Sequence, residues 1–466
     1  MSDPRVDTLI DEALRLRLSR RSIMRRGAAL GLSTAAVSGV LTSTNRASAA
    51  PRAAAFLQER QLNILQASYF VPEGEDFYNS AAQEWGSQNG VAVTCDYIGW
   101  NDLQPRIAAA VEGGSGADII EMWDVWPYLY QENMVPVDDL AAQVSEAYGG
   151  FYDWVIDTAS VDGKWYSVPH GNSSSAFTYR ISLVEEAGIE DPRNNFPQTY
   201  EEFFALGKTL KAMGKPFGQG LSHEPGDAPG FAYPFMWAHG AMEVEEDGTT
   251  VAINKPEFVE ALQAFTQVWV DAYDESGLSW DGAANNRAFL SDQISGTFNG
   301  SSVYLAAVDA KEGESTLDYE VVVDPDDIWH AGYPEGPAGR FNALGSRSFA
   351  AMSYSPNADA GVEFLEYFFS PEVFIPWLEV QGGYIIPMAP GYADHEMYTG
   401  NPALAPFPAV SAYGRPKGYA GPSNQKAAEA AARYILVDMF AQAIQSGDAA
   451  SAVQQAEALL KRVYEG

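Results

Sequence analysis

Three short runs between residues 62 and 122 decide the fold: LNILQA (62–67), VAVTCDY (91–97) and ADIIEM (117–122). Each has the length and the apolar or β-branched content of a strand. The segments between them have helical spacing, so the order is strand, helix, strand, helix, strand. This order predicts an α/β fold with a mostly parallel sheet and helices on both faces.

The segments that connect and follow these strands read as helices. Apolar residues recur at helical spacing from Phe77 to Trp85, and Gly90 follows as a C-terminal cap; the next helix is expected around residues 103–111. A second αβ series then begins, with Thr199 capping one helix and residues 256–273 forming another. Near the C-terminus, Ala431, Ile435, Leu436, Met439, Phe440 and Ile444 predict a helix that Gly447 ends, and a last helix reaches Val463.

The composition indicates a folded protein of more than one packing unit. The chain has 466 residues, of which 46% are hydrophobic, so it can bury sizeable cores in two or more units. Its single cysteine, Cys95, excludes an internal disulfide and a thiolate cluster for zinc. We expect a buried and inert thiol.

The chain is strongly acidic. Its 28 Lys and Arg against 62 Asp and Glu give a formal net charge of -34. Such a surface repels phosphate backbones and anionic lipids, so binding to nucleic acid or to a membrane surface is not expected. The acidity is interpreted as a contribution to solubility rather than as a ligand-steering device.

The first 49 residues resemble a twin-arginine (Tat) export signal. The sequence SRRSIM (19–24) precedes an apolar stretch (27–41), and ASA (47–49) offers small residues for a signal peptidase. The stretch is shorter than the roughly 20 residues of a membrane span, and no cysteine follows it for a lipid anchor. We expect cleavage after Ala49, a linker at 50–60 and a periplasmic or extracellular protein. The alternative is an ordinary amphipathic basic helix.

Eight motifs stand in order over about four hundred residues: Gly116–Ile120, Val135–Leu140, Asp162–Pro169, Tyr179-Arg180, Glu186–Ile189, Phe196–Phe203, Asn299–Ser302, and Ala360–Leu365 with Ser370–Glu372. Together they resemble family 1 of the extracellular solute-binding proteins, the maltose-binding-protein type. Asp162–Pro169 and Asn299–Ser302 match stretches in which the family crosses between its two lobes.

The resemblance implies a two-lobed periplasmic-binding-protein type II fold with a ligand cleft between the lobes. It implies a sugar, oligosaccharide or polyol as ligand, and an ABC permease with its ATPase as partner. We expect a monomer without a cofactor or metal. The expected lobes are residues 61–169 with 302–353 (lobe 1) and residues 170–301 with 354–466 (lobe 2).

The candidate ligand contacts are aromatic and polar side chains in loops expected to face the cleft. Flat rings cover the C–H faces of a sugar, while carboxylates and amides bind its hydroxyl groups. After the first three strands these residues are Tyr69, Trp100, Asn101, Trp123, Asp124 and Trp126. Near the crossovers they are His170, Asn172, Asn299, Ser301 and Tyr304, and from the second lobe Asp227, Trp280, Asn286 and Tyr384.

Signatures of catalysis are missing from the sequence. The five histidines lack zinc-type spacing, and no nucleophile elbow, phosphate loop or dinucleotide fingerprint is present. Acidic pairs such as Asp138-Asp139 and Glu201-Glu202 fall at expected helix starts, where their negative charges interact favourably with the helix dipole. The prediction is therefore a binding protein and not an enzyme. Two alternatives are a secreted glycoside hydrolase, which needs two acids facing a glycosidic bond, and an adhesion module, which normally brings repeats or an anchor.

Overall fold

The structure is a computed structural model that describes residues 60–466 as one unit with two halves. The expected export signal (1–49) and the expected linker up to residue 59 lie outside the described residues. Residue 60, the last of the expected linker, is the first residue of a strand.

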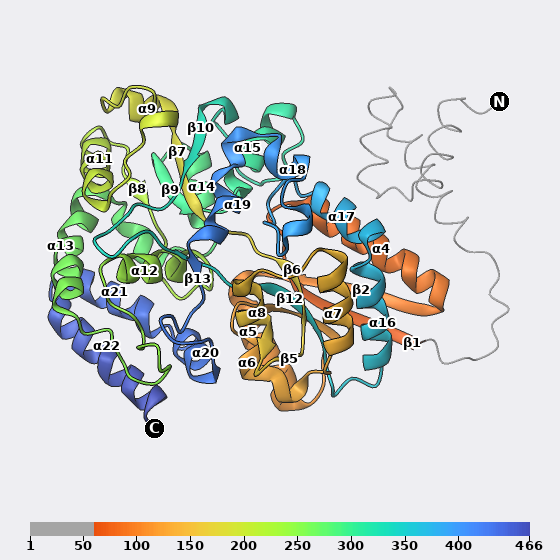
Figure 1. Cartoon of the computed structure of the whole chain (residues 1–466). Coiled ribbons are helices and arrows are strands. Elements are labelled where there is room, and N and C mark those ends of the chain that lie inside the picture. The colour runs from red at the N-terminus through yellow and green to blue at the C-terminus, as the bar shows by residue number, and fades with distance from the viewer. Residues whose placement is uncertain (1–59) are drawn as a thin grey trace, which may run out of the picture. The chain divides into compact units, whose positions relative to one another are not determined.

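Lobe 1, as named here, is the half of this unit that is built on a five-stranded sheet in the order β2-β1-β3-β12-β6 (Figure 1). Its strands are β1 (Arg60–Ala67), β2 (Val91–Ile98), β3 (Ile119–Trp123), β6 (Val168–Gly171) and β12 (Arg347–Ala351). β1 runs parallel to β2 and β3, as the sequence predicts, whereas β12 is antiparallel to both β3 and β6.

The helices of lobe 1 come from both ends of the described chain. α4 (Pro72–Asn89) begins with a proline and ends at Gly90, whose φ of 67° gives the predicted left-handed cap. α16 (Ala358–Phe368) and α17 (Pro371–Glu379) pack on α4, and Tyr78 of α4 contacts Phe364 and Phe368. The remaining helices and short strands of this half are α5 (Trp100–Gly113), α6 (Pro127–Tyr130), α7 (Asp138–Ala147), α8 (Asp153–Ala159), β4 (Ser160–Val161), β5 (Lys164–Trp165) and α18 (Glu396–Thr399).

Lobe 2 is the half built on a four-stranded sheet in the order β10-β7-β9-β8. Its strands are β7 (Ala176–Arg180), β8 (Phe217–Gly218), β9 (Gly296–Asn299) and β10 (Ile328–Ala331). β7 is antiparallel to β10 and to β9, and β8 is parallel to β9. The α/β fold is thus confirmed, but the sheets are of mixed orientation rather than mostly parallel. β7 and β12 enter their sheets from the boundary between the lobes, without the helical crossover that places consecutive strands in parallel.

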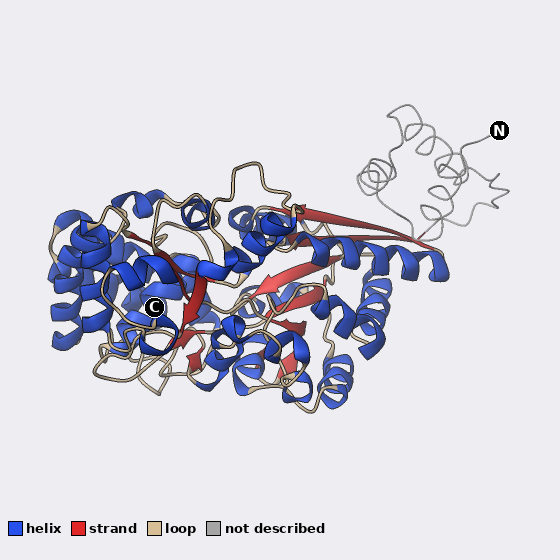
Figure 2. Ribbon diagram, turned by 90° about the horizontal axis from the view of Figure 1, so that it is seen from above, coloured by secondary structure: helices blue, strands red, loops and turns tan. Residues whose placement is uncertain are grey.

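Helices flank the strands of both lobes, as Figure 2 shows from above. In lobe 2 the predicted helix α11 (Tyr200–Ala212) starts with a capping box in which Thr199 and Glu202 satisfy each other's backbone N–H groups. The core helices are α12 (Asp227–Ala238), α13 (Pro256–Ala272), α21 (Ile435–Ser446) and α22 (Ala449–Tyr464). The smaller helices are α9 (Ile181–Glu186), α10 (Pro192–Asn195), α14 (Ala284–Leu290), α15 (Ser302–Glu312), α19 (Pro406–Ala409) and α20 (Gln425–Ala432). Ala431, expected in one helix with Phe440, lies in α20 instead, because Tyr434 adopts a left-handed conformation with φ 53° and separates the two helices.

The chain passes between the lobes at other points than the sequence suggests. Residues 172–175 connect β6 to β7, and residues 344–346 connect β11 (Asn342–Ala343) to β12, while β11 pairs with β13 (Gly414–Arg415). Asn299–Ser302 is a turn from β9 into α15, and residues 302–331 pack on lobe 2. Residues 358–379, expected in lobe 2, belong to the core of lobe 1. An amphipathic helix shows which of its faces is buried, but not which sheet covers that face.

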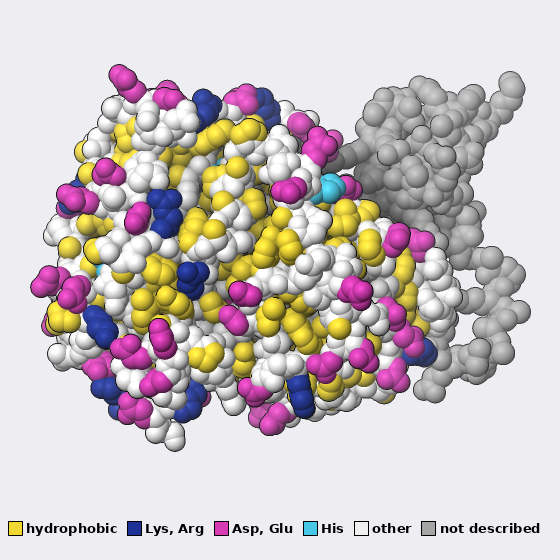
Figure 3. Space-filling view, in the orientation of Figure 1, with side chains coloured by type: hydrophobic (Ala, Val, Ile, Leu, Met, Phe, Trp, Pro, Cys, Tyr) yellow, Lys and Arg dark blue, Asp and Glu magenta, His cyan; other side chains and the backbone are white. Residues whose placement is uncertain are grey.

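None of the helices that the structure describes is both long and apolar enough to cross a membrane. The displayed face in Figure 3 carries acidic side chains scattered over both lobes, as a solubility role of the charge requires.

A buried carboxyl group ties the last helix to lobe 2. Glu243 is fully buried and accepts a hydrogen bond of 2.7 Å from the hydroxyl of Tyr464 in α22. Burial raises the pKa of Glu243 to about 7, from 4.5. A carboxyl with a raised pKa in the folded state stabilises the fold while it is protonated, and that contribution is lost as the pH rises from about 4.5 to about 7.

We therefore predict that Glu243→Gln, which keeps an uncharged polar group, weakens this pH dependence. Between pH 5 and pH 8 the wild-type protein should lose about 3 kcal/mol of unfolding free energy relative to the variant, at 1.36 kcal/mol per pKa unit. Urea unfolding at both pH values measures this difference. The control is Glu246→Gln at an exposed position; equal pH dependence of all three proteins would contradict the assignment.

Candidate functional site

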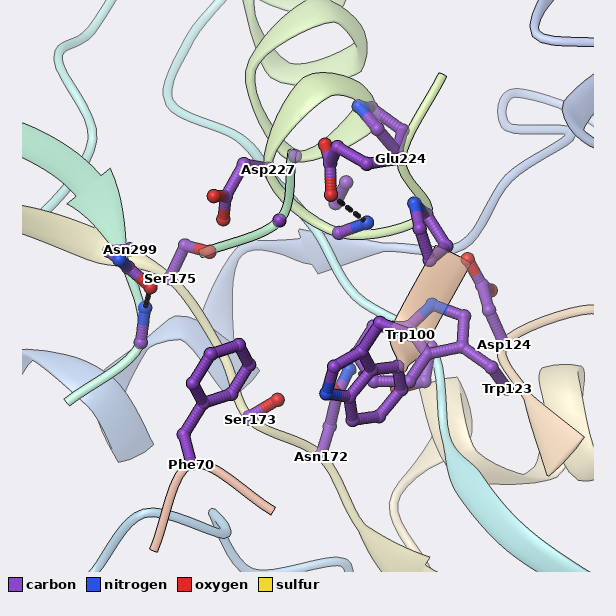
Figure 4. Close-up of a pocket in the computed structure, with 18 of the residues that line it drawn as sticks. Phe70, Trp100, Trp123, Asp124, Asn172, Ser173, Ser175, Glu224, Asp227 and Asn299 are labelled. Carbon is purple, nitrogen blue, oxygen red and sulfur yellow. Dashed lines mark hydrogen bonds between the residues drawn. The ribbon is translucent and has the colours of Figure 1, made fainter. Parts of the chain in front are cut away.

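A cavity that is partly open to solvent is lined by residues of both lobes and of the segments that connect them (Figure 4). Lobe 1 contributes the ends of its parallel strands: Trp100 follows β2, and Trp123 ends β3. Lobe 2 contributes the N-terminus of α12 and the end of β9. The cavity therefore lies beyond the carboxyl ends of strands, where α/β folds bind ligands.

One wall of the cavity is aromatic. The rings of Trp100 and Trp123 lie 4.7 Å apart, edge to face at 74°, and Phe70 stands beside them in Figure 4. The Nε1 atom of Trp100 is buried and has no hydrogen-bond partner within residues 60–466. The wall thus offers apolar faces together with one free N–H donor.

A buried ion pair supports this wall. Arg347 of β12 donates to Glu121 Oε1 of β3 through its Nε at 2.8 Å and a terminal nitrogen at 2.5 Å. The Arg347 guanidinium carbon lies 4.7 Å from the ring centroid of Trp100 and 5.7 Å from that of Trp123. This geometry favours cation–π attraction, which helps to hold both rings in place on the side where Arg347 lies.

Burial and the ion pair together determine the protonation states of His170 and Glu121. His170 Nε2 lies 3.3 Å from Glu121 Oε1, and burial lowers the pKa of His170 to about 4, so the imidazole is neutral at pH 7. Burial alone would raise the pKa of Glu121, but Arg347, assisted by His170, lowers it on balance. The charges beneath the wall are therefore one carboxylate and one guanidinium, and they cancel.

The opposite wall carries carboxyl groups at the start of α12. Glu224 accepts hydrogen bonds from the backbone N–H groups of Gly226, at 2.8 Å, and Ala228. It therefore caps the helix, whose positive end favours a carboxylate. Asp227 Oδ2 accepts from the amide of Asn285 at 2.6 Å. Burial raises the pKa of Glu224, and burial together with the neighbouring Glu224 raises the pKa of Asp227 well above its usual range.

An ion pair closes one side of the cavity. Lys417, which follows β13, contacts Asp124 at the end of β3, and both side chains are about nine-tenths buried. Asp124 has a left-handed backbone with φ 52°. A Cβ at position 345 would lie 2.1 Å from Asp124 Oδ1, so only glycine fits at this crossing between the lobes.

Amide and hydroxyl groups of the connecting segment complete the lining. Asn172 donates through Nδ2 to the Gly345 carbonyl, while its Oδ1 is buried without a partner within residues 60–466. Asn299 Nδ2 donates to Asn286 Oδ1 at 2.5 Å. Ser173 and Ser175 line the same side. The cavity thus combines flat apolar rings with several hydrogen-bonding groups.

The structure brings several of the predicted contact residues together at this cavity: Trp100, Trp123, Asp124, Asn172, Asp227, Asn299 and Tyr384 all line it.

Eight predicted residues lie outside the lining. Three are in the interior: Tyr69 packs against Trp377, His170 lies beneath the aromatic wall, and Ser301 is buried. Asn286 holds Asn299 from behind, and Tyr304 accepts a hydrogen bond of 3.0 Å from Asn401.

The other three are Trp280, Trp126 and Asn101. Trp280 packs in the core around α14 and α15. Trp126 lines a neighbouring cavity that shares Trp123 and Lys417 with the first. Asn101 is exposed and donates at 2.9 Å to the carbonyl of His223 in lobe 2, so it bridges the two lobes.

Several residues that line the cavity are not among those predicted from the sequence. Phe70 follows Tyr69 directly. Successive side chains of an extended segment point to opposite sides, so the inward direction of Tyr69 could have indicated that Phe70 faces the cavity. Ser173 and Ser175 share the segment of Asn172. No local signal pointed to Glu224, Lys417 or the supporting Arg347, because their roles depend on partners far away in the sequence.

Within residues 60–466, no three His, Cys, Asp or Glu side chains gather closely enough to hold a metal ion.

Residues 80–406 match the family described as bacterial extracellular solute-binding protein, and the chain belongs to this family. Among curated proteins it is similar to a binding protein of Brucella abortus (strain 2308), with 22% identity over 361 residues that cover 75% of this chain and 81% of the relative.

Solved structures share the fold. The GacH receptor of Streptomyces glaucescens GLA.O, solved unliganded and with acarbose, has a TM-score of 0.71 at 17% identity and covers 87% of this chain and 99% of its own. Maltose-bound MalE3 of T. maritima has a TM-score of 0.72 at 16% identity, covering 86% and 99%. A ribitol-bound solute-binding protein of Agrobacterium radiobacter K84 has a TM-score of 0.71 at 17% identity, covering 88% and 100%. The two-lobed fold expected from the resemblance is therefore confirmed.

We predict that Arg347→Met destabilises the protein by about 3–5 kcal/mol, because it leaves the Glu121 carboxylate buried without its partner. Urea unfolding at pH 7 measures the loss. Arg287→Met is the control, since Arg287 and its partner Asp281 are about half exposed and such pairs contribute about 0–1 kcal/mol. Equal losses in both variants would show that the buried pair does not support lobe 1.

Proposed function

We propose that this protein captures a carbohydrate or polyol in the cavity between its lobes and delivers it to the permease of an ABC importer. The observation that carries the proposal is the pairing of an aromatic wall, Trp100 and Trp123, with a hydrogen-bonding wall around Asp227. Family membership and solved relatives that hold maltose, ribitol or acarbose support the same ligand class.

The two walls match the two surfaces of a sugar. The C–H face of a pyranose or polyol chain packs on an indole ring, and its hydroxyl groups bind carboxylate and amide oxygens. Asn172 Oδ1, Asp124 Oδ1 and Trp100 Nε1 are buried at or beside the cavity without partners within the described residues. Buried polar groups are normally satisfied, so a polar ligand that supplies the missing partners gains affinity there.

Binding across two lobes also provides the signal to the transporter. The lobes meet through connecting segments and through contacts such as Asn101 with the His223 carbonyl. A ligand that touches both walls stabilises the closed arrangement over the open one, because only the closed arrangement makes both sets of contacts. The closed form then docks on the permease and its ATPase.

The carboxyl groups of the cavity favour binding over hydrolysis. A glycoside hydrolase needs two free acids facing the scissile bond. Asp124 is held by Lys417, and Glu224 is occupied by the backbone of α12. We therefore infer that the protein performs no covalent chemistry.

We further propose that the protein is a monomer that acts outside the cytoplasm. The twin arginine at positions 20 and 21 supports export.

The first test is calorimetric titration with a panel of sugars and polyols, including maltose and ribitol. Trp123→Ala should weaken binding of any ligand found by about tenfold, because an aromatic face is worth about 0.5–1.5 kcal/mol beyond its area. Trp329→Ala is the matched control, since Trp329 stacks on Arg193 in lobe 2 and does not line the cavity.

Two results would oppose the binding proposal. One is a panel in which no carbohydrate or polyol binds. The other is a Trp123→Ala variant that binds as tightly as the wild-type protein and the Trp329→Ala control.

The second test addresses hydrolysis. The wild-type protein should release no nitrophenol from aryl glycosides, and a bound oligosaccharide should be recovered intact by mass spectrometry. Turnover that Asp227→Asn abolishes, and that Asp271→Asn on the surface of α13 leaves in place, would establish the hydrolase alternative instead.

A further inference from the structure

The cavity has an excess of carboxyl groups over cations. Four ionisable side chains other than tyrosine line it: Asp124, Glu224, Asp227 and Lys417. The single cation, Lys417, forms its ion pair with Asp124. Within residues 60–466, no Lys, Arg or His forms an ion pair with Glu224 or Asp227. Lys417 is still near enough to lower the pKa of Glu224, so Asp227 is the carboxyl group of the lobe 2 wall that has no counter-charge.

Asp227 is the more available of the two. Both oxygens of Glu224 accept from the backbone of α12, whereas Asp227 has one side-chain donor, Asn285, on its Oδ2. Figure 4 shows the Asp227 carboxyl group above the cavity, across from the rings of Phe70 and Trp100. The charged form of Asp227 is disfavoured by burial and by Glu224, which raise its pKa. A cation placed beside it would relieve both costs.

Independent evidence comes from the buried atoms that lack partners. Asp124 and Asn172 line the cavity and are 93–95% buried, with relative exposures of 7% and 5%. The Oδ1 atom of each is without a hydrogen-bond partner among the described residues. Asn172 is fixed in this orientation, since its Nδ2 donates to the Gly345 carbonyl. The free atoms of these two residues and of Asp227 are acceptors, whereas Trp100 Nε1 is a single free donor, so the cavity suits a ligand that supplies several donors and keeps at least one acceptor.

We propose that the ligand carries a protonated amine, so that the preferred substrate class is an amino sugar or an aminated polyol, with its ammonium group at Asp227 and its carbon skeleton against Trp123. This inference rests on the proposed carbohydrate-binding function. An ammonium group provides three donors for the free acceptors of this cavity, and the hydroxyl groups of the same ligand can accept from Trp100 Nε1. A ligand with a carboxylate or phosphate would meet Asp227 and Glu224 with no free cation on the cavity wall to bind it.

The test compares matched pairs of ligands by calorimetry at pH 7 and low salt. The pairs are D-glucosamine with D-glucose, D-galactosamine with D-galactose, and 1-amino-1-deoxysorbitol with sorbitol. In any pair that binds, the amine should bind at least about tenfold more tightly, because charge-assisted hydrogen bonds are about twice as strong as neutral ones. The preference should shrink as sodium chloride screens the charges.

Variants assign the effect to Asp227. Asp227→Asn keeps the size and polarity of the side chain, and it should bring the affinity ratio of amine to neutral ligand to about one. Asp271→Asn, which removes a partly exposed carboxylate of α13 outside the cavity, should keep the ratio of the wild-type protein. Unchanged binding of the neutral ligand of each pair to Asp271→Asn confirms that this control is folded.

The outcomes separate the inference from the function on which it rests. If neutral sugars or polyols bind and their amines bind no more tightly, the inference is overturned and the proposed function stands. If Asp227→Asn retains the amine preference, the assignment to Asp227 is overturned. If no neutral or aminated carbohydrate binds, both the inference and the proposed function fail.

Discussion

The buried ion pair between Glu121 and Arg347 is the interaction on which the arrangement of the site depends. It joins β3 to β12, two strands separated by 226 positions in the sequence. Two charges removed from water are tolerated only when each is paired and hydrogen-bonded. This requirement fixes the side chain of Arg347 against Trp100 and Trp123. The pairing of β12 with β3 therefore sets the position of the aromatic wall.

The two lobes contribute different chemistry to the cavity. Lobe 1 provides the rings, lobe 2 provides the carboxyl groups at the start of α12, and the connecting segment 172–175 provides amide and hydroxyl groups. Neither wall alone surrounds a ligand. A ligand that contacts both walls is therefore sensitive to the relative position of the lobes, which is the physical basis of the proposed closure.

The parts of the fold that the sequence predicts well are those with local signals. The strands β1 and β2, the cap at Gly90 and the capping box at Thr199 each depend on residues that are neighbours in the chain. The assignment of later segments to lobes was less successful. Residues 302–331 and 358–379 pack on the opposite lobes from those expected, because a hydrophobic face does not identify its partner.

The same distinction applies to the site. Trp100, Trp123 and Asp124 could be predicted because the ends of parallel strands meet at one edge of a sheet. Asp227 was identified as a polar residue in a loop, but its neighbour Glu224 was not. Lys417 was missed because its partner, Asp124, lies 293 positions away, and a single lysine in a loop carries no sequence signal. Tyr69 was expected at the cavity, but its neighbour Phe70 lines it instead. The predicted loop is at the cavity, whereas the predicted direction of its side chains is wrong.

The central claim is that one ligand touches the aromatic wall of lobe 1 and the carboxyl wall of lobe 2 at the same time. A crystal structure of the protein with a bound carbohydrate tests it most directly. The account predicts ligand carbon atoms within about 4 Å of the Trp123 ring and a ligand donor within about 3.2 Å of an Asp227 oxygen. A ligand that contacts only one lobe, or that binds elsewhere on the protein, would contradict it.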